Sequence, residues 1–115
     1  MRLRRKLRAS LPQAGGVGCG KPGAVTLRYA GEVVVDYDLR LQEMFGHERL
    51  WVRGYSNDVF AYIPSERVLK EGGYEGGGAM IYYVQPGPWA PSVESTIISA
   101  TERLVQSLAA PGAGK

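Results

Sequence analysis

The chain has 115 residues, 44% of them hydrophobic, enough for one small domain that buries about two-thirds of its unfolded surface. Its formal net charge is +3, but five of the 14 basic residues lie in the first eight positions, and the remaining nine are balanced by 11 acidic residues. This slightly acidic body excludes a nucleic-acid-binding domain. Because no run of about 18 apolar residues occurs, the sequence predicts no transmembrane segment.

Residues 1–23 combine a basic start, MRLRRKLR, with a glycine-rich stretch. No apolar segment of about 7–15 residues follows the basic start, so we expect no signal peptide. Residues 15–21 match the G-x-x-x-x-G-K part of a phosphate-binding loop, but Pro22 stands where a Ser or Thr hydroxyl is needed. We therefore predict no cofactor-binding loop here, and we expect residues 1–23 and the tail 110–115 to be disordered.

The next part of the chain has the pattern of short strands around a helix. Residues 24–29 alternate between polar and apolar, as in a strand, and Leu50 to Val52 form an apolar run that suits a second strand. Between them, residues 33–35 open either another short strand or a helix. A strand-helix-strand order within such a short stretch favours an α/β layer.

Two longer helices are predicted. The first begins at Asp36 or Asp38 and ends at Phe45, before a glycine. The second begins at Pro91-Ser92 and continues to about residue 109. Its apolar and small residues recur at helical spacing, which predicts an amphipathic helix packed on the core; they are Val93, Ile97, Ile98, Thr101, Leu104, Val105 and Leu108. The predicted fold class is therefore α/β, a small strand-helix-strand layer with a C-terminal amphipathic helix.

The stretch from Leu50 to Tyr83 carries many polar, aromatic and glycine residues between strand-like runs, which is typical of a site on loops. Within it, residues 65–70 predict a short helix. Asn57 is interpreted as a structural residue that closes a turn. The glycines 76–78 are expected to permit a close backbone approach or a positive φ.

Four motifs in this part of the chain occur in the same order as in a known family. They are Gly31-Glu32-Val33-Val34, Gly54-Tyr55-Ser56-Asn57, Tyr62-Ile63 and Tyr74-Glu75-Gly76-Gly77. Together they resemble the neutral/alkaline non-lysosomal ceramidases, and more closely the bacterial ceramidase-like proteins. The resemblance covers roughly residues 24–108. It implies that residues 24–109 are a fragment of a larger α/β catalytic domain, namely its C-terminal segment.

The resemblance implies the chemistry of zinc-dependent amide hydrolysis on N-acyl lipids such as ceramide. Glu32 and Tyr62 would be two zinc ligands, and Tyr74 would hydrogen-bond the developing oxyanion. From the residues alone, Glu32 also fits a solvated turn carboxylate. Tyr62 also fits a core tyrosine with a satisfied hydroxyl.

The chain departs from the family pattern in its histidines. The family has two zinc-binding histidines upstream of this segment, and their motifs are absent here. The only histidine, His47, does not match them and is predicted to lie in a surface loop.

Two ligands do not make the usual three-ligand catalytic site, so we expect the chain alone to be inactive. The missing N-terminal part of the catalytic domain or another chain would be its partner. The alternative is a non-catalytic α/β module that packs against a partner chain. Family members are often secreted or periplasmic.

The resemblance also predicts a geometry. If Glu32 and Tyr62 share one ion, they must converge at one edge of the sheet. Parallel strands over 24–29 and 50–53 would achieve this, with the two side-chain oxygens roughly 3–5 Å apart, given zinc–oxygen bonds near 2 Å. Tyr74 should point toward the same space.

Overall fold

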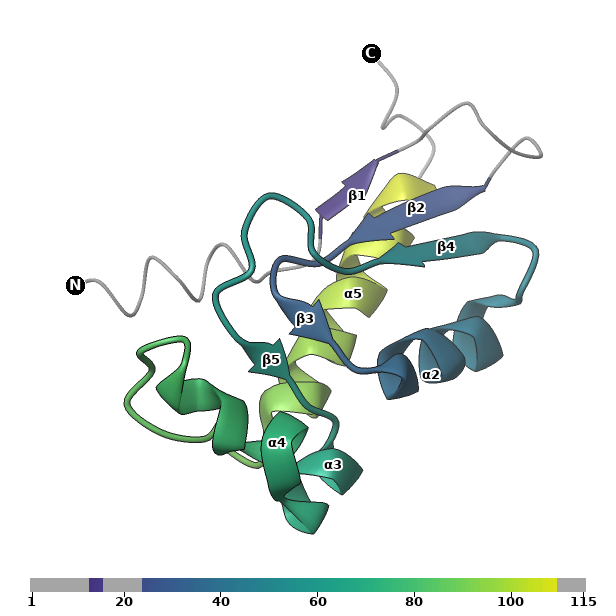
Figure 1. Cartoon of the computed structure of the whole chain (residues 1–115). Coiled ribbons are helices and arrows are strands. Elements are labelled where there is room, and N and C mark those ends of the chain that lie inside the picture. The colour runs from purple at the N-terminus through teal and green to yellow at the C-terminus, as the bar shows by residue number, and fades with distance from the viewer. Residues whose placement is uncertain (1–12, 16–23, 110–115) are drawn as a thin grey trace.

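The computed structural model describes residues 13–15 and 24–109 (Figure 1). In chain order its elements are β1 (Gln13–Gly15), β2 (Val25–Arg28), β3 (Glu32–Val33), α2 (Val35–Phe45), β4 (Leu50–Arg53), β5 (Tyr62–Ile63), α3 (Glu66–Glu71), α4 (Gly73–Gly76), the 3-10 helix η1 (Gly78–Ile81) and α5 (Val93–Ala109). The α/β fold class is thus confirmed, with short strands and a long C-terminal helix.

The strands form two small sheets. The two chain segments that pair in the first sheet continue and pair again in the second. β2 pairs with β4 in parallel, and β3, which follows β2, pairs in parallel with β5, which follows β4. The predicted strands over 24–29 and 50–52 are confirmed. Parallel neighbours need a crossover, and helix α2 supplies it between β3 and β4. In Figure 1 the β3–β5 pair continues away from the larger sheet toward α3 and α4.

The predicted helices are present, but α2 begins at Val35, with Val34 as its N-cap and no side-chain cap, and not at Asp36 or Asp38. Helix α2 has two aspartates in its first turn, where the helix dipole favours negative charge, and it ends at Gly46 with φ 92°. Helix α3 begins after Ser65, whose hydroxyl accepts a hydrogen bond from the amide of Val68 at 3.2 Å. Helix α5 extends behind the strands of both sheets (Figure 1). Among the described residues, no helix combines the length and apolar character needed to cross a membrane.

The core lies between α5, α2 and the strands. Leu27, Tyr29, Tyr37, Leu41 and Ile63 are fully inaccessible to solvent, and each such side chain contributes about 1.5–3 kcal/mol by leaving water. The predicted apolar stripe of α5 is buried in the first turns of the helix, at Val93, Ile97, Ile98 and Thr101. Leu108, near the end of the helix, is 40% exposed and does not belong to the core.

Three polar contacts connect α5, α2 and the segment before α5 to the strands or to residues next to them. The Tyr29 hydroxyl lies 2.7 Å from the Thr101 hydroxyl of α5, and the Tyr37 hydroxyl donates to the carbonyl of Pro64 at 3.0 Å. The Trp89 indole donates to the carbonyl of Tyr62 at 2.7 Å. The buried hydroxyls are therefore satisfied, which is the condition for placing tyrosine in a core.

The N-terminal segment differs in part from the expected disorder of residues 1–23. Residues Gln13–Gly15 form strand β1, which pairs antiparallel with β2. The edge of β2 presents unpaired main-chain groups, and a short segment can satisfy them without any apolar periodicity of its own. The rest of that expectation, and the expectation for the tail 110–115, lie outside the described residues.

We expect the protein to lose stability between about pH 10 and 12. Burial raises the pKa of the Tyr29 phenol from 10.0 to about 12, against the opposing effect of its hydrogen bond to Thr101. Because the folded state holds this proton more tightly, the stabilisation is complete below the unfolded pKa and is lost as the pH rises through the folded pKa. Two pKa units correspond to about 2.7 kcal/mol.

Urea unfolding at pH 9, 10, 11 and 12 measures this loss. The matched control is Tyr29→Phe, which keeps the ring; Thr101 still donates to the carbonyl of Ile97 at 2.9 Å. The variant should show a shallower decline with pH than the wild-type protein. Equal declines would contradict the assignment to Tyr29.

Candidate functional site

Glu32 and Tyr62 lie directly opposite each other. They are register partners in the parallel β3–β5 pair, so their side chains leave the same face of this short sheet. The amide of Glu32 donates to the carbonyl of Ala61 at 2.9 Å, which fixes this register. Hydrogen bonding to the Glu32 carboxylate is the main cause that raises the pKa of Tyr62 above its usual value, and burial adds to it.

Two further tyrosine hydroxyls point at the same carboxylate. The Tyr55 hydroxyl donates to Oε1 of Glu32 at 2.5 Å, and the Tyr83 hydroxyl approaches Oε2 at 3.5 Å. The bond to Glu32 raises the pKa of Tyr55; for Tyr83, burial is the larger cause and the charge of Glu32 the next. One carboxylate is thus surrounded by three phenols that come from three separate parts of the chain.

Tyr74 packs against Tyr62. Their rings meet edge to face, with centroids 5.4 Å apart and planes at 74°, and Tyr83 meets Tyr62 in a similar way at 6.3 Å and 72°. The rings of Tyr82 and Tyr74 also lie close together, with their centroids 6.1 Å apart. We call Glu32 and the tyrosines around it the tyrosine cluster. Its members are Glu32, Tyr55, Tyr62, Tyr74, Tyr82 and Tyr83.

Helix α4 positions Tyr74, and it does so through a glycine. A Cβ atom on Gly76 would lie 2.6 Å from the carbonyl oxygen of Val68 in α3, so the two helices approach as closely as they do only because Gly76 has no side chain. This confirms the close backbone approach expected at glycines 76–78.

A pocket of about 440 Å³ adjoins the tyrosine cluster. Its wall includes Glu32, Tyr55 and Tyr62 and continues over the start of α2 and the ends of α3 and α4. The charged side chains on that further wall are Asp36, Arg67, Glu71 and Glu75. The pocket therefore carries more negative than positive charge, and its polar end is formed by one carboxylate with two phenols.

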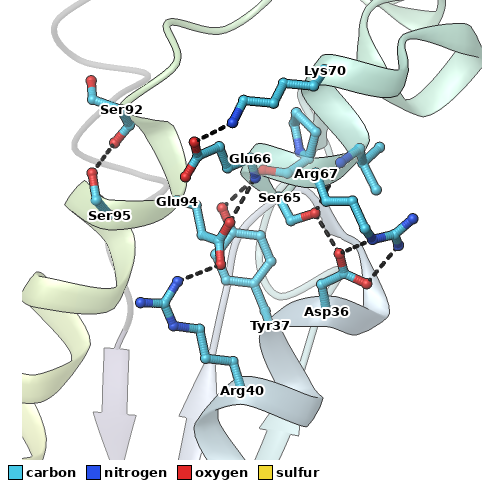
Figure 2. Close-up of polar contacts among 12 residues, drawn as sticks. Asp36, Tyr37, Arg40, Ser65, Glu66, Arg67, Lys70, Ser92, Glu94 and Ser95 are labelled. Atoms are coloured by element: carbon cyan, nitrogen blue, oxygen red, sulfur yellow. Dashed lines mark hydrogen bonds and ion pairs between the residues drawn. The ribbon is translucent and has the colours of Figure 1, made fainter.

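An ion-pair network closes the α3 side of this pocket. Arg67 donates to Asp36 at 2.9 Å, and Ser65 donates to Asp36 at 2.5 Å (Figure 2). Arg67 also donates to Glu71 at 2.9 Å. The hydrogen bonds from Arg67 and then Ser65 lower the pKa of Asp36. Arg67 is thus bound to protein carboxylates and braces α3 against α2.

The oxygen donors of the tyrosine cluster match part of the ligand set of a zinc site. Glu32 and Tyr62 offer two oxygen donors on one face, whereas a catalytic zinc has three protein ligands as a rule. Within residues 13–15 and 24–109, no group of three or more His, Cys, Asp and Glu side chains is arranged to hold a metal ion. His47 is exposed in the connection between α2 and β4, as predicted, and does not line the pocket.

Glu32 and Tyr62 lie opposite each other and Tyr74 contacts the ring of Tyr62, and β2 and β4 are parallel as the argument required. The expected separation of roughly 3–5 Å between the two oxygens stays a prediction. The two residues lie within a strand pair of their own, where the sequence suggested a turn and a loop. Their roles as metal ligands and oxyanion donor stay predictions. Tyr55 and Tyr83 were not anticipated. A signal for Tyr55 exists, since an aromatic residue in a polar turn has no obvious core to enter.

No protein-family model matches this chain, and neither a curated protein nor a solved structure does. The resemblance to ceramidases therefore rests on its motif residues.

Proposed function

We propose that this chain supplies the carboxylate and phenol half of a zinc-dependent amide hydrolase site of the ceramidase type. The observation that carries the proposal is the register of Glu32 with Tyr62, with the Tyr74 ring against Tyr62. These are the three residues to which the resemblance assigns chemical roles. Glu32 and Tyr62 share one face of a strand pair, Tyr74 contacts Tyr62, and the three come from positions far apart in the sequence, which supports a common site.

In the proposed site, Glu32 and Tyr62 hold the ion by their oxygens. Zinc, when bound, polarises the amide carbonyl and lowers the pKa of its water. Tyr62 binds a metal as phenolate, so its proton must leave, and the carboxylate of Glu32 now opposes that loss. A dication near the phenol would favour the loss of that proton. Metal binding is therefore expected to release a proton.

Tyr74 is the proposed oxyanion donor. Its side chain is 49% exposed next to Tyr62, so its hydroxyl is available to a substrate carbonyl. A neutral phenol donates a hydrogen bond to the charge that develops on the carbonyl oxygen, and a donor of this kind is typically worth about 2.7–4 kcal/mol. Within the described part of the chain, Tyr74 forms no hydrogen bond to Glu32, so its hydroxyl is separate from the proposed metal-binding oxygens.

The remaining ligands would come from a polypeptide that carries two histidines, either the N-terminal part of the same catalytic domain or a separate chain. The proposed substrate class is an N-acyl lipid with a secondary amide. In this proposal the chain alone does not turn over substrate, because two protein ligands do not complete a catalytic zinc site.

A second candidate function is a non-catalytic interaction module. It is favoured by the segment after α4, where Ile81, Tyr82 and Val84 are 80%, 76% and 88% exposed. From Gly76 to Val93 the sequence contains no charged residue. Exposed apolar side chains in an uncharged segment are typical of a surface that packs against another protein.

The proposal is tested by Zn²⁺ titration of the 115-residue protein, followed by NMR. We expect shifts centred on residues 32 and 62. Glu32→Gln and Tyr62→Phe should each weaken binding at least about 10-fold, because each removes a ligand, and loss of even an outer partner costs that much. Glu43→Gln, on the exposed face of α2, is the matched control and should bind as the wild-type protein does.

The same protein is assayed with a fluorogenic N-acyl-sphingosine. We expect no turnover with or without Zn²⁺, and turnover only after addition of a histidine-bearing polypeptide that completes the site. Zinc that binds equally well to Glu32→Gln would contradict the proposal. So would chelator-sensitive turnover by Tyr62→Phe.

A further inference from the structure

Tyr55 has an unusual backbone conformation for an aromatic residue. Its φ is 54°, in the left-handed region, where glycine or asparagine is the ordinary occupant. Two main-chain hydrogen bonds hold the loop there: the amide of Tyr55 donates to Gly31 at 2.9 Å, and the amide of Ser56 donates to Tyr29 at 3.0 Å. The loop is thus fixed to the segment that leads directly into Glu32.

Packing does not explain this conformation. The Tyr55 side chain is 61% exposed and does not belong to the core. What the conformation achieves is the short hydrogen bond from its hydroxyl to Oε1 of Glu32, at 2.5 Å. A strained residue that persists without a packing role is a reason to look for function.

The hydrogen bond from Tyr55 also makes the two carboxylate oxygens of Glu32 unequal. A phenol that donates to an ionised carboxylate forms one of the stronger kinds of hydrogen bond, and it fixes the rotamer of the acceptor. Oε1 accepts the short bond from Tyr55, whereas Tyr83 approaches Oε2 at the longer distance of 3.5 Å. Of these two tyrosine partners, that of Oε2 is the weaker, and the Tyr62 phenol, which also bonds to the carboxylate, is the second proposed ligand.

We propose that Tyr55 is a positioning residue that fixes the Glu32 carboxylate through Oε1 and leaves Oε2 to bind the ion. This rests on the proposed function, since it assigns a task to Tyr55 at the same site. Ligating carboxylates are commonly oriented by such outer hydrogen bonds. Tyr55 touches no substrate and no ion in this role, and it acts through Glu32 alone.

The first measurement needs no metal. Side-chain coupling constants of Glu32, measured by NMR, report whether the carboxylate arm occupies one rotamer. We expect a single rotamer in the wild-type protein and in Tyr83→Phe, and averaging in Tyr55→Phe. Tyr83→Phe is the matched control, because it removes the same group from the other carboxylate oxygen. Unchanged core amide shifts in both variants establish that the fold is kept. A single Glu32 rotamer in Tyr55→Phe overturns the proposal.

The second measurement is the Zn²⁺ dissociation constant. Tyr55→Phe should raise it about 10–100-fold, the usual effect of losing an outer partner of a metal ligand. Tyr83→Phe should change it less than about 3-fold, because a contact of 3.5 Å is weak. Equal zinc affinity in Tyr55→Phe and the wild-type protein overturns the proposal. If the wild-type protein binds no zinc, the proposed function fails, and the rotamer measurement alone decides the role of Tyr55.

Discussion

Replacing Gly31 with alanine is expected to lower the free energy of unfolding by about 2–5 kcal/mol and to disrupt the tyrosine cluster. Gly31 has φ 85°, which costs an alanine about 1–2 kcal/mol. Its Cβ would also lie 2.8 Å from Cδ1 of Ile63 and 3.0 Å from the carbonyl oxygen of Ala61, and overpacking of this kind costs about 1–3 kcal/mol. The strand pair that aligns Glu32 with Tyr62 must then separate.

Chemical denaturation measures the change, and Gly73→Ala is its matched control. Gly73 has a similar φ of 75°, but no atom lies within 4 Å of the position of its Cβ. The control therefore reports the backbone cost without the steric cost. If both variants lose the same stability, the contact with β5 is not what requires glycine at position 31.

Replacing Gly76 with alanine should cost about 1–3 kcal/mol and should move Tyr74 away from Tyr62. The new Cβ would lie 2.6 Å from the main-chain oxygen of Val68, and backbone cannot rotate aside as a side chain does. Helix α4 must shift from α3, and it carries Tyr74 with it. Ring-current shifts in the NMR spectrum of Tyr62 report the loss of the edge-to-face contact directly.

Gly87→Ala serves as the control for this variant. No atom lies within 4 Å of the position of its Cβ, and its stability should stay within about 0.5 kcal/mol of the wild-type value. A Tyr62 spectrum that is unchanged in Gly76→Ala would mean that α4 does not depend on this approach to position Tyr74.

The regular elements were predictable because their signals are local. The aspartates at the start of α2, the serine before α3 and the apolar repeat of α5 each act within a few residues of the chain. The parallel pairing of β2 with β4 followed from the strand-helix-strand order. Strand β1 was missed, because main-chain pairing to a free edge leaves no pattern in the side chains.

Only part of the site could be predicted. Motif spacing identified Glu32, Tyr62 and Tyr74, and parallel pairing brings the first two together. Tyr55 depends on a left-handed residue and on main-chain bonds to a distant segment, and Tyr83 follows a 3-10 helix whose course no periodicity encodes. Such contacts depend on the fold of the whole chain, so no local sequence pattern predicts them.

One side chain, Glu94 of α5, bonds to two other helices. Its carboxylate accepts from Arg40 of α2 at 2.6 Å and from the amide of Glu66, the first residue of α3, also at 2.6 Å (Figure 2). If the first turn of α5 frays, α2 loses an ion pair and α3 loses the partner of its leading amide in the same event. We therefore expect the three helices to open together in one subglobal step, so that amide exchange in the pocket wall formed by α3 precedes exchange in the buried strands.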